Sequence, residues 1–501
     1  MKFTRRGYGQ LRRADDTVVS QHTVPEEAYE RASREPAGTY TWYPARIEIE
    51  VPAVPAPAPV PAPVPAPAPA PSPAPSPAPS GRLMPADLTY LGAFRLGRHQ
   101  PLEAFGGEEG VASISWREDA GTLIVQSRGQ VIGEFAPVAP VVSANADALP
   151  EAVPVAGYSN PVVGAPGNDR TGAVVWASPR AGQPARMYWS TYEYYNTDAT
   201  DYPSLGWASI SGQTMSASAG AWHVGLRGLP QWHGQRFGQY VISIPQAWAD
   251  AHTGGRSILV GRMREAGGAG GSMGPVLAAV GPWVDGPPPA GGDLSAVLLM
   301  SYASADWNGD AGQSRAWEAW RSLGDPAYTY WSPSDWHLGG AWVERNGKRA
   351  LVMGGRKAEF DNDPPQPKYG DSGSHGAVGS NVPPYCYGTG GVECKGELAI
   401  SSSKGYHCGP YSPRLWFYDV AHLEEVAAGT RQPDQMQSYA CLDPKRAGHW
   451  TNRRTANVSQ YVAGPAYDPA TGTLFVLDPQ GDDPLGHPNP YWPIVHVYQV
   501  N

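Results

Sequence analysis

The stretch WREDAGTLIV, residues 116–125, aligns without a gap with YDPATGTLFV, residues 467–476. In each, an aromatic residue ends one apolar segment, a glycine follows five residues later in a tight turn, and a second apolar segment begins. The stretch WVERNG, residues 342–347, fits the same frame but adds two residues before the next apolar segment. A hairpin that recurs at distant places in the chain predicts a domain assembled from repeated units.

Short apolar segments fill the chain beyond residue 82, and no segment there is clearly helical. This pattern predicts a mainly β chain with a β-propeller head of six or seven blades, at roughly 40–50 residues per blade. A large β-sandwich or jelly roll remains the alternative. Pairing of residues 88–96 with 494–500 in one blade would close the ring and remove its exposed edges. Other candidate strands are residues 172–176, 186–189, 239–244, 257–260, 296–302 and 414–419.

The composition agrees with a turn-rich β head. Charged residues make up 17% of the 501 residues, against about 25% in a typical domain. The chain has 60 glycines and 53 prolines, which favour turns, and 18 tryptophans and 26 tyrosines, which favour strands. The net charge of −9 argues against a general nucleic-acid binder.

A proline-rich segment divides the chain. From Pro55 to Pro79 every second residue is proline, separated only by Ala, Val or Ser. Proline fixes φ and lacks a backbone donor, so the segment predicts a polyproline II rod of roughly 85 Å. We therefore divide the chain into a small module (1–51), a stalk (52–81) and a head (82–501).

The first 51 residues predict a β-β-α-β-β module. Residues 17–20, 39–43 and 46–51 are typical of strands, and residues 26–34 have helical character after the capping-box pair Thr23 and Glu26. A module of this size has a marginal core, which predicts that it binds a partner or forms an oligomer.

The N-terminal segment is basic but lacks the apolar stretch of a secretory signal, and no run of about 18 apolar residues follows anywhere. We expect synthesis in a cytoplasm and no membrane partner. The early basic residues favour a solvated strand end over a nucleic-acid contact. They are Lys2, Arg5, Arg6, Arg12 and Arg13.

All four cysteines lie close together in the sequence. Their spacings lack the Cys-x-x-Cys pattern of a zinc ribbon, so we favour one or two disulfides that form after the chain leaves the cytoplasm. Zinc held with help from His407, or unpaired structural thiols, are the alternatives. One of the three connectivities pairs Cys386 with Cys394 and Cys408 with Cys441.

One acidic segment resembles a calcium loop. Asp306, Asn308 and Asp310 have the right Asp-x-Asn-x-Asp spacing, but the glycine at Gly312 and the acid at Glu318 each come one place late. Plain turns explain most such clusters. Structural calcium is thus the one possible cofactor, and we expect no other.

Aromatic residues are abundant in the expected loops, above all between residues 360 and 413. Their rings offer apolar area with a polar edge, which suits sugar or protein ligands, although each ring could instead pack between blades. The candidate binding residues are Trp331, Trp336, Tyr385, Tyr387, Tyr406, Tyr411 and Trp492.

Signatures of catalysis are absent from the sequence. It has no Gly-x-Ser-x-Gly, His-Glu-x-x-His or Walker A motif, and no Gly-x-Gly-x-x-Gly that opens a helix after a strand. We therefore assign no catalytic residue. A glycosidase needs only two carboxylates that the fold brings together, so an enzyme remains an alternative.

Two parts of the chain resemble known families. TVVSQHTVPEEA (17–28) and IEIEV (47–51) resemble a short module of tailed-bacteriophage virion proteins, which precedes a linker and a variable head. YLGAFR (90–95), KGYH (404–407) and LWFYD (415–419) look like a family of bacterial and phage proteins of propeller type. The head departs from that family in its four cysteines and its long Gly/Pro loops.

The resemblance implies a structural protein on the virion surface, made in the host cytoplasm without a signal peptide. Residues 1–51 would dock on capsid or tail proteins, and the head would bind a glycan or protein of the host surface or environment. A capsid-decorating head fibre, a spike and a tail-fibre-like adhesin fit equally, each as an oligomer in the assembly. The alternatives are a polysaccharide depolymerase or glycosidase on the same stalk, and a cell-surface protein.

Overall fold

The structure is a computed structural model of the whole chain. The chain divides into two compact units, Met1–Pro75 and Ser76–Asn501. In the parts that the structure describes, no helix is both long enough and apolar enough to cross a membrane. The described residues are 9–13, 18–22, 40–44, 81–97, 113–126, 132–162, 170–193, 201–216, 218–262, 275–302, 335–358, 368–369, 406–407, 411–451, 461–482 and 492–501.

The first unit contains a three-stranded antiparallel sheet in the order β2-β1-β3. Its strands are β1 (Gly9–Arg13), β2 (Val18–His22) and β3 (Tyr40–Pro44). Two of them overlap predicted strands. The predicted helix at 26–34, the predicted strand at 46–51 and all of the proline-rich stalk except Gly81 lie outside the described residues.

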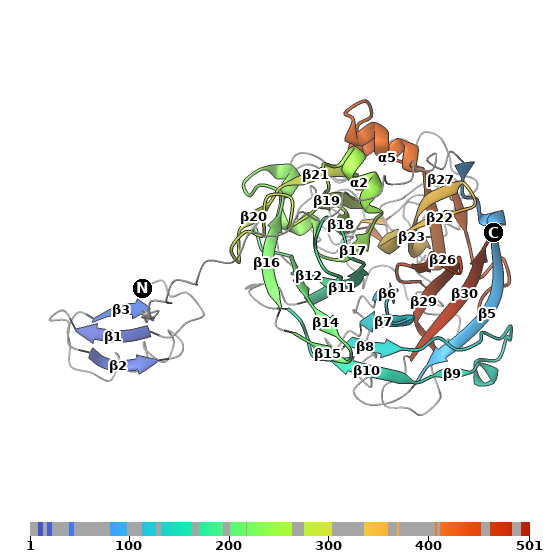
Figure 1. Ribbon diagram of the computed structural model, residues 1–501, viewed down its shortest axis with the longest axis horizontal. Helices are drawn as coiled ribbons and strands as arrows, with labels where there is room; N and C mark the ends of the chain where they lie inside the picture. The colour runs from blue at the N-terminus through green and yellow to red at the C-terminus, as the bar shows by residue number, and fades with distance from the viewer. Residues whose placement is uncertain are drawn as a thin grey trace, which may run out of the picture. The chain divides into compact units, whose positions relative to one another are not determined.

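The second unit is a ring of β-sheets arranged as blades around one axis (Figure 1). Blade 1 contains β6 (Ser113–Arg117), β7 (Thr122–Gln126), β8 (Ile132–Phe135) and β10 (Pro154–Tyr158). Blade 2 contains β11 (Arg170–Ala177), β12 (Arg186–Tyr192), β13 (Leu205–Ala208), β16 (Ala219–Val224) and β20 (Asp293–Leu294). Blade 3 contains β17 (Tyr240–Ser243), β18 (Ile258–Arg262), β19 (Val276–Val280) and β21 (Ala296–Ser301).

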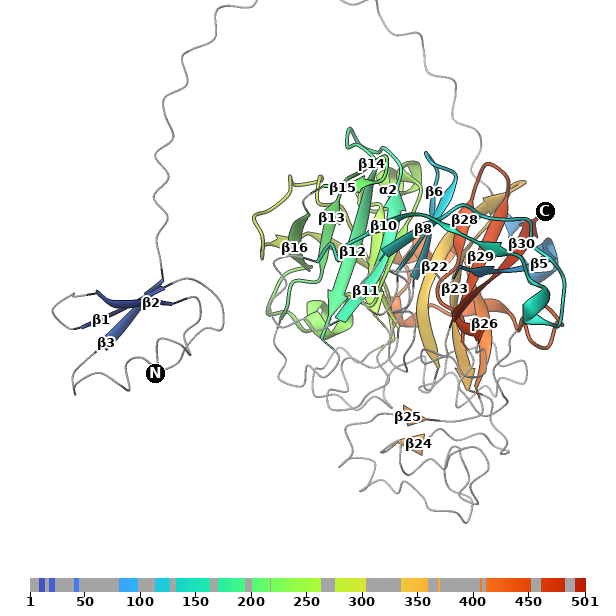
Figure 2. The same ribbon diagram turned by 90° about the horizontal axis from the view of Figure 1, so that it is seen from below.

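The last two blades involve the start of the head. Blade 4 contains β22 (Trp336–Arg345), β23 (Lys348–Ala358), β26 (Tyr411–Tyr418) and β27 (Ser438–Leu442), and β4 (Gly81–Arg82) pairs parallel to β23. Blade 5 contains β28 (Ala466–Asp468), β29 (Thr473–Asp482), β30 (Trp492–Val500), β5 (Leu88–Leu96) and β9 (Glu151–Ala152). Figure 2 shows the strands running through the thickness of the ring.

Short elements decorate the blades. Two small two-stranded sheets pair β14 (Ile210–Ser211) with β15 (Thr214–Met215) and β24 (Lys368–Tyr369) with β25 (Tyr406–His407). The described helices are α2 (Gln246–His252), α5 (Val420–Ala427), η1 (Pro85–Asp87), η3 (Ala146–Ala148), η4 (Pro230–Trp232), η5 (Gly234–Arg236) and η9 (Pro433–Gln435).

The first strand of each blade lies nearest the axis, and these inner strands form a closed ring. In order around the ring they are β6, β11, β17, β22 and β28, and β28 again lies beside β6. The prediction of a mainly β chain with a propeller head is confirmed. The predicted count of six or seven blades is wrong, because the described strands form five. Single blades take more sequence than we assumed: blade 4 alone extends from residue 336 to residue 442.

The repeated hairpin seen in the sequence is the inner hairpin of three blades. Trp116 pairs with Leu123 in blade 1, Trp342 with Leu351 in blade 4, and Tyr467 with Leu474 in blade 5. The glycine of each turn has a positive φ, a conformation that side chains disfavour. The repeat therefore does mark the unit of the fold.

The two ends of the head meet in blade 5, as predicted. β5 pairs antiparallel with β30, and Ala93 lies opposite His496. The backbone N–H of Asn501 donates to the carbonyl of Asp87 at 2.9 Å. This pairing closes the ring with hydrogen bonds, and the edge of each terminal strand that faces the other is paired.

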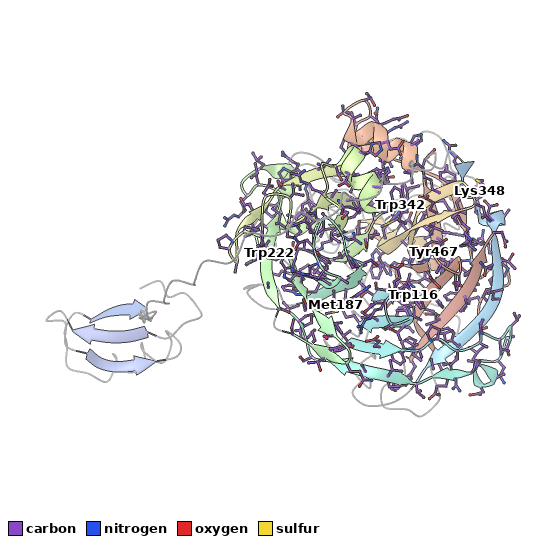
Figure 3. The ribbon with its side chains drawn as sticks, in the orientation of Figure 1. Trp116, Met187, Trp222, Trp342, Lys348 and Tyr467 are labelled. Atoms are coloured by element: carbon purple, nitrogen blue, oxygen red, sulfur yellow. The ribbon has the colours of Figure 1, made fainter. Side chains whose placement is uncertain are left out.

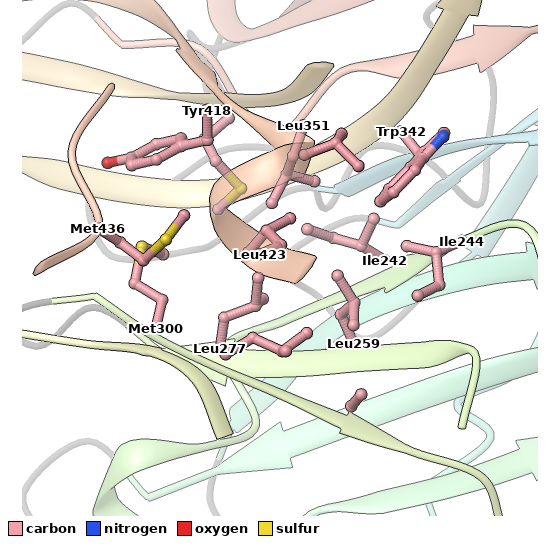
Figure 4. Close-up of a cluster of buried hydrophobic side chains, with 14 of the residues drawn as sticks. Ile242, Ile244, Leu259, Leu277, Met300, Trp342, Leu351, Tyr418, Leu423 and Met436 are labelled. Carbon is pink, nitrogen blue, oxygen red and sulfur yellow. The ribbon is translucent and has the colours of Figure 1, made fainter. Parts of the chain in front are cut away.

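A hydrophobic cluster fills each of the five interfaces between neighbouring blades. Alternation along the strands creates them: Leu123 and Val125 of β7 face blade 5, whereas Ile124 between them faces blade 2. The cluster between blades 3 and 4 also takes in Leu423 of α5 (Figure 4). The cores thus lie between blades, and the axis is left for other side chains.

Candidate functional site

A cavity of about 430 Å³ lies on the propeller axis and is lined by residues of all five blades. It is at the end of the axis where the inner strands β6, β11, β22 and β28 turn back into the second strands. Concave sites of this size hold small ligands in many proteins. The cavity is therefore the candidate binding site.

Aromatic rings from four blades form much of the cavity wall. Trp116, Trp342 and Tyr467, which share one position in the repeated hairpin, gather toward the middle of the ring (Figure 3). Trp176 of β11 adds a fourth ring. The aromatic residue of the repeated hairpin stands at the end of the inner strand. Because the inner strands surround the axis, the aromatic residues of the three repeats meet there. Blade 3 is the exception, because β17 ends at Ser243 and gives the cavity no aromatic ring.

The rings differ in how far they are covered. Trp176 and Trp342 are only 5% and 7% exposed, and Trp342 packs on Trp248 of α2 with ring centroids 5.1 Å apart. Trp116 is partly exposed, and one face of its indole stacks on Phe475 at 5.6 Å. Tyr467 is also partly exposed. Trp116 and Tyr467 are therefore the rings that a ligand meets most directly.

Two exposed carboxylates stand beside the aromatic wall. Glu118 follows Trp116 by two residues and accepts a hydrogen bond from the Ser178 hydroxyl. Glu344 follows Trp342 by two residues, and the Trp342 indole N–H reaches its carboxylate at 3.4 Å. The Tyr467 hydroxyl donates to the backbone carbonyl of Glu344 at 2.9 Å. The carboxylate oxygens can accept hydrogen bonds from ligand hydroxyls.

Arg180 completes the wall on the side of blade 3. It projects from the turn between β11 and β12, and its Nη2 donates to the Ser243 hydroxyl at 2.7 Å. Its Nη1 donates to the carbonyls of Ile244 and Ser257, both at 3.2 Å. Burial lowers the pKa of Arg180, and the nearby Glu118 opposes that shift. The guanidinium links blades 2 and 3 where the aromatic ring is missing.

The opposite end of β22 carries a second polar group, which is buried. Lys357 and Asp335 are both 0% exposed, and the lysine Nζ lies 2.7 Å from the carboxylate. His337 stacks on Trp416, with ring centroids 4.3 Å apart, and its Nε2 lies 2.8 Å from the Tyr418 hydroxyl. Burial, with a contribution from Lys357, lowers the pKa of His337 to about 3. The lysine and the aspartate thus pair with each other inside the protein, and His337 has a partner at Nε2 but none at Nδ1 among the described residues.

Of the aromatic residues predicted as binding sites, Trp336 and Trp492 are described with their side chains, and neither lines the cavity. Trp336 begins β22, six residues before Trp342, and the Arg356 guanidinium lies 3.2 Å from its ring centroid. Trp492, at the start of β30, is 2% exposed and belongs to the core. Tyr406 lies in β25 and Tyr411 in β26. Trp331, Tyr385 and Tyr387 lie outside the described residues.

The cysteine and calcium predictions are mostly beyond what the structure describes. Cys441 lies in β27 and is partly buried, while Cys386, Cys394 and Cys408 lie outside the described residues. The calcium candidates Asp306, Asn308 and Asp310 lie there too. Within the described residues, no group of three or more His, Cys, Asp or Glu side chains is arranged to hold a metal ion.

The cavity residues were missed by reasoning from the sequence, although a signal was present. Trp116, Trp342 and Tyr467 were identified as markers of a strand end, and the two glutamates lie just beyond two of them. In a propeller the inner strands converge on the axis, so a residue repeated at their ends must face its counterparts. To infer that these residues face one another, one must know how the blades close into a ring. The sequence alone does not determine this.

Comparisons with known proteins add little. No family model matches the chain, and no curated protein sequence matches it. Among solved structures, Raptor from Chaetomium thermophilum is similar over 82% of this chain, with 9% identity and a TM-score of 0.29. This chain covers 29% of the length of that chain. Similarity at this level supports no functional argument.

Proposed function

We propose that this chain is a structural protein of the virion surface of a tailed bacteriophage, and that its propeller head binds a glycan of the host surface or environment. The observation that carries the proposal is the axial cavity, where partly exposed aromatic rings stand beside two carboxylates. Sugar rings present apolar faces that pack on aromatic side chains, and hydroxyls that donate to carboxylates. This combination is typical of carbohydrate sites.

The size of the cavity favours a glycan over a protein partner at this site. About 430 Å³ is enough for a few sugar rings. A stable protein interface usually buries roughly 1,200 Å² or more in total, which needs a broad surface and not a small axial hollow.

The remaining parts of the proposal concern display. Residues 1–51 resemble a virion module, and the chain divides into two compact units at a boundary within the proline-rich segment, between Pro75 and Ser76. We infer that the first unit docks on capsid or tail proteins. Many copies on one particle would bind a surface by avidity, so each head needs only modest affinity.

Glycan binding is tested with the full chain on an array of bacterial surface polysaccharides. Trp116→Ala removes the accessible ring and is expected to weaken binding at least about tenfold, the effect of losing a packed aromatic contact. Trp283→Ala is the matched control, because Trp283 is also partly buried but lies outside the cavity. Equal binding by both variants and the parent would exclude the cavity as the site.

Docking is tested separately by co-sedimentation with phage particles that lack this protein. The full chain should sediment with the particles, and a chain without residues 1–51 should stay in solution. If the shortened chain sediments as well as the full chain, the proposed orientation on the particle is wrong.

A carbohydrate-active enzyme is the second candidate, because Glu118 and Glu344 line the same cavity from two blades. Glycosidases use such a pair as acid and base or nucleophile. This candidate predicts reducing ends released from a bound polysaccharide, and their loss in both Glu118→Gln and Glu344→Gln. Binding without release of reducing ends would leave the protein as an adhesin.

A further inference from the structure

Arg180 is the one cation that lines the axial cavity in the described part of the chain. The hydrogen bonds that hold it all end on uncharged oxygens. The acceptors are the carbonyls of Ser178, Ile244 and Ser257 and the hydroxyls of Ser243 and Ser257.

Two buried arginines of the described blades are held by carboxylates instead. Arg117 lies 3.0 Å from the carboxylate of Glu134, and Arg414 lies 2.7 Å from that of Asp443. Arg180 has no carboxylate within 4.0 Å among the described residues. Its closest acidic neighbour in the cavity, Glu118, instead accepts a hydrogen bond from Ser178. The positive charge of Arg180 is therefore held in place without a direct counter-ion.

The guanidinium also keeps a donor in reserve. Nη2 carries two hydrogens, and the Ser243 hydroxyl is its single acceptor in the described structure. A guanidinium N–H donates a strong, charge-assisted hydrogen bond to a carboxylate. Partial burial strengthens that attraction, because less water competes, and it also lowers the pKa of Arg180.

We infer that the ligand of the axial cavity is an acidic saccharide, one whose uronic-acid carboxylate lies against the Arg180 guanidinium. The sugar rings then pack on Trp116 and Tyr467, and Glu118 and Glu344 accept hydrogen bonds from hydroxyls. This inference rests on the proposed glycan binding and names the class of glycan. It assigns Arg180 to specificity, beyond its role in joining two blades.

The ligand side is tested without altering the protein. The full chain is titrated with oligomers of galacturonate, of guluronate and mannuronate, and of glucuronate-containing hyaluronan. Each is compared with its carboxyl-reduced form, which keeps the rings and hydroxyls but removes the charge. At least one acidic oligomer should bind about tenfold or more tightly than its reduced form, as expected for a charged hydrogen bond. That preference should weaken with added salt.

The protein side uses Arg180→Gln, which removes the charge, and Arg180→Lys, which keeps the charge without the planar guanidinium. The glutamine variant should lose the preference for the acidic form, and the lysine variant should keep part of it. Arg256→Gln is the matched control, since Arg256 also joins segments of blade 3 but lies outside the cavity. It donates to oxygens of Ser295 and Thr253, and it also lies 3.8 Å from the carboxylate of Asp285. Thermal unfolding of each variant identifies any that fails to fold, and the comparison of ligands stands in that case.

The outcomes separate the two proposals. Equal binding of acidic and reduced oligomers, or a preference that survives in Arg180→Gln, overturns the inference about acidic sugars. If neutral glycans bind and Trp116→Ala abolishes that binding, glycan recognition stands and only the acidic class fails. If no oligomer binds, acidic or neutral, both proposals fall.

Discussion

The inner strand of blade 4, β22, has polar groups at both of its ends. Those at one end are exposed to solvent, and those at the other end are buried. At one end, Glu344 is exposed beside Trp342 in the axial cavity. At the other, Asp335 is fully buried against Lys357, and His337 is buried against Tyr418. The same strand therefore carries an open group of polar residues and a closed one.

The difference separates structure from function. A buried charge must be neutralised within the protein, because an unpaired charge in the interior costs several kcal/mol. The Asp335–Lys357 pair meets this demand inside the protein, where both side chains are fully buried. The charges at the cavity end face solvent, so their pairing can await a ligand. Substitutions at the two ends should therefore change different properties.

The largest loss of stability is expected from Lys357→Met. It leaves the buried carboxylate of Asp335 without its ammonium partner, which costs about 3–5 kcal/mol. Urea unfolding of the full chain measures it. Lys348→Met is the control, because the Lys348–Asp87 pair is more exposed, at 41% and 15%, and should contribute about 1 kcal/mol or less. Similar losses in the two variants would show that the buried pair is not special.

Trp342→Ala comes next, since Trp342 is 7% exposed and packs on Trp248 between blades 3 and 4. Removing a buried tryptophan costs about 3 kcal/mol or more. Trp116→Ala should lower stability less than Trp342→Ala does, because Trp116 is partly exposed. It should nevertheless weaken glycan binding at least as much as Trp342→Ala. Urea unfolding and glycan titration of both variants test whether the loss of stability and the loss of binding rank the two variants differently. A binding loss that simply follows the stability loss would contradict it.

The fold was predictable to the extent that the chain repeats itself. The inner hairpins of blades 1, 4 and 5 share one frame, and each appears in the sequence. Blades 2 and 3 depart from that frame. The turn after Trp176 is longer and carries Arg180, and α2 stands between β17 and β18. A repeat of three could not fix the blade number, because the irregular blades and their long connections hid two units.

The site was harder to predict for a related reason. The aromatic residues of the repeat were interpreted as strand ends, and the search for a ligand surface turned to the loops. Trp342 and Trp336 show the difference, since they lie on one strand and only Trp342 reaches the cavity. Which end of a strand meets its neighbours across the axis depends on ring closure, a long-range property that local pattern does not contain. Arg180 had no local signal at all.

Acid should lower the free energy of unfolding, in part through the buried His337 at the closed end of β22. His337 has its pKa lowered to about 3 by burial, while an unfolded histidine has a pKa near 6.5. Below pH 6.5 the histidine of the unfolded chain binds a proton, whereas His337 in the folded chain stays neutral. The contribution of His337 to the free energy of unfolding is therefore lost as the pH falls from about 6.5 to 3. The slope should reach about 1.4 kcal/mol per pH unit for this residue.

His496 of blade 5 adds a similar dependence, with its pKa also lowered to about 3 by burial. In His337→Gln the slope of unfolding free energy against pH should therefore fall by up to about 1.4 kcal/mol per pH unit, but not to zero, because the other histidines with lowered pKa values still contribute. Urea unfolding at a series of pH values between 6.5 and 4 provides the measurement. An unchanged slope in the variant would mean that His337 is protonated in the folded protein.

The smallest effect on stability is expected at the open end. Glu344→Gln keeps the shape of an exposed side chain, so the free energy of unfolding should change by no more than about 0.5 kcal/mol. Its effect should appear in ligand binding instead, because the amide accepts hydroxyl hydrogen bonds less strongly than the carboxylate. For an acidic oligosaccharide the substitution also has an opposite effect on affinity. It removes a negative charge from the cavity wall, and that charge repels the ligand's carboxylate. Titration with acidic and carboxyl-reduced oligomers separates the two: the reduced form should bind more weakly to the variant, and the acidic form should lose less. A large loss of stability in this variant would show that Glu344 belongs to the closed kind of polar group, and the contrast between the two ends of β22 would fail.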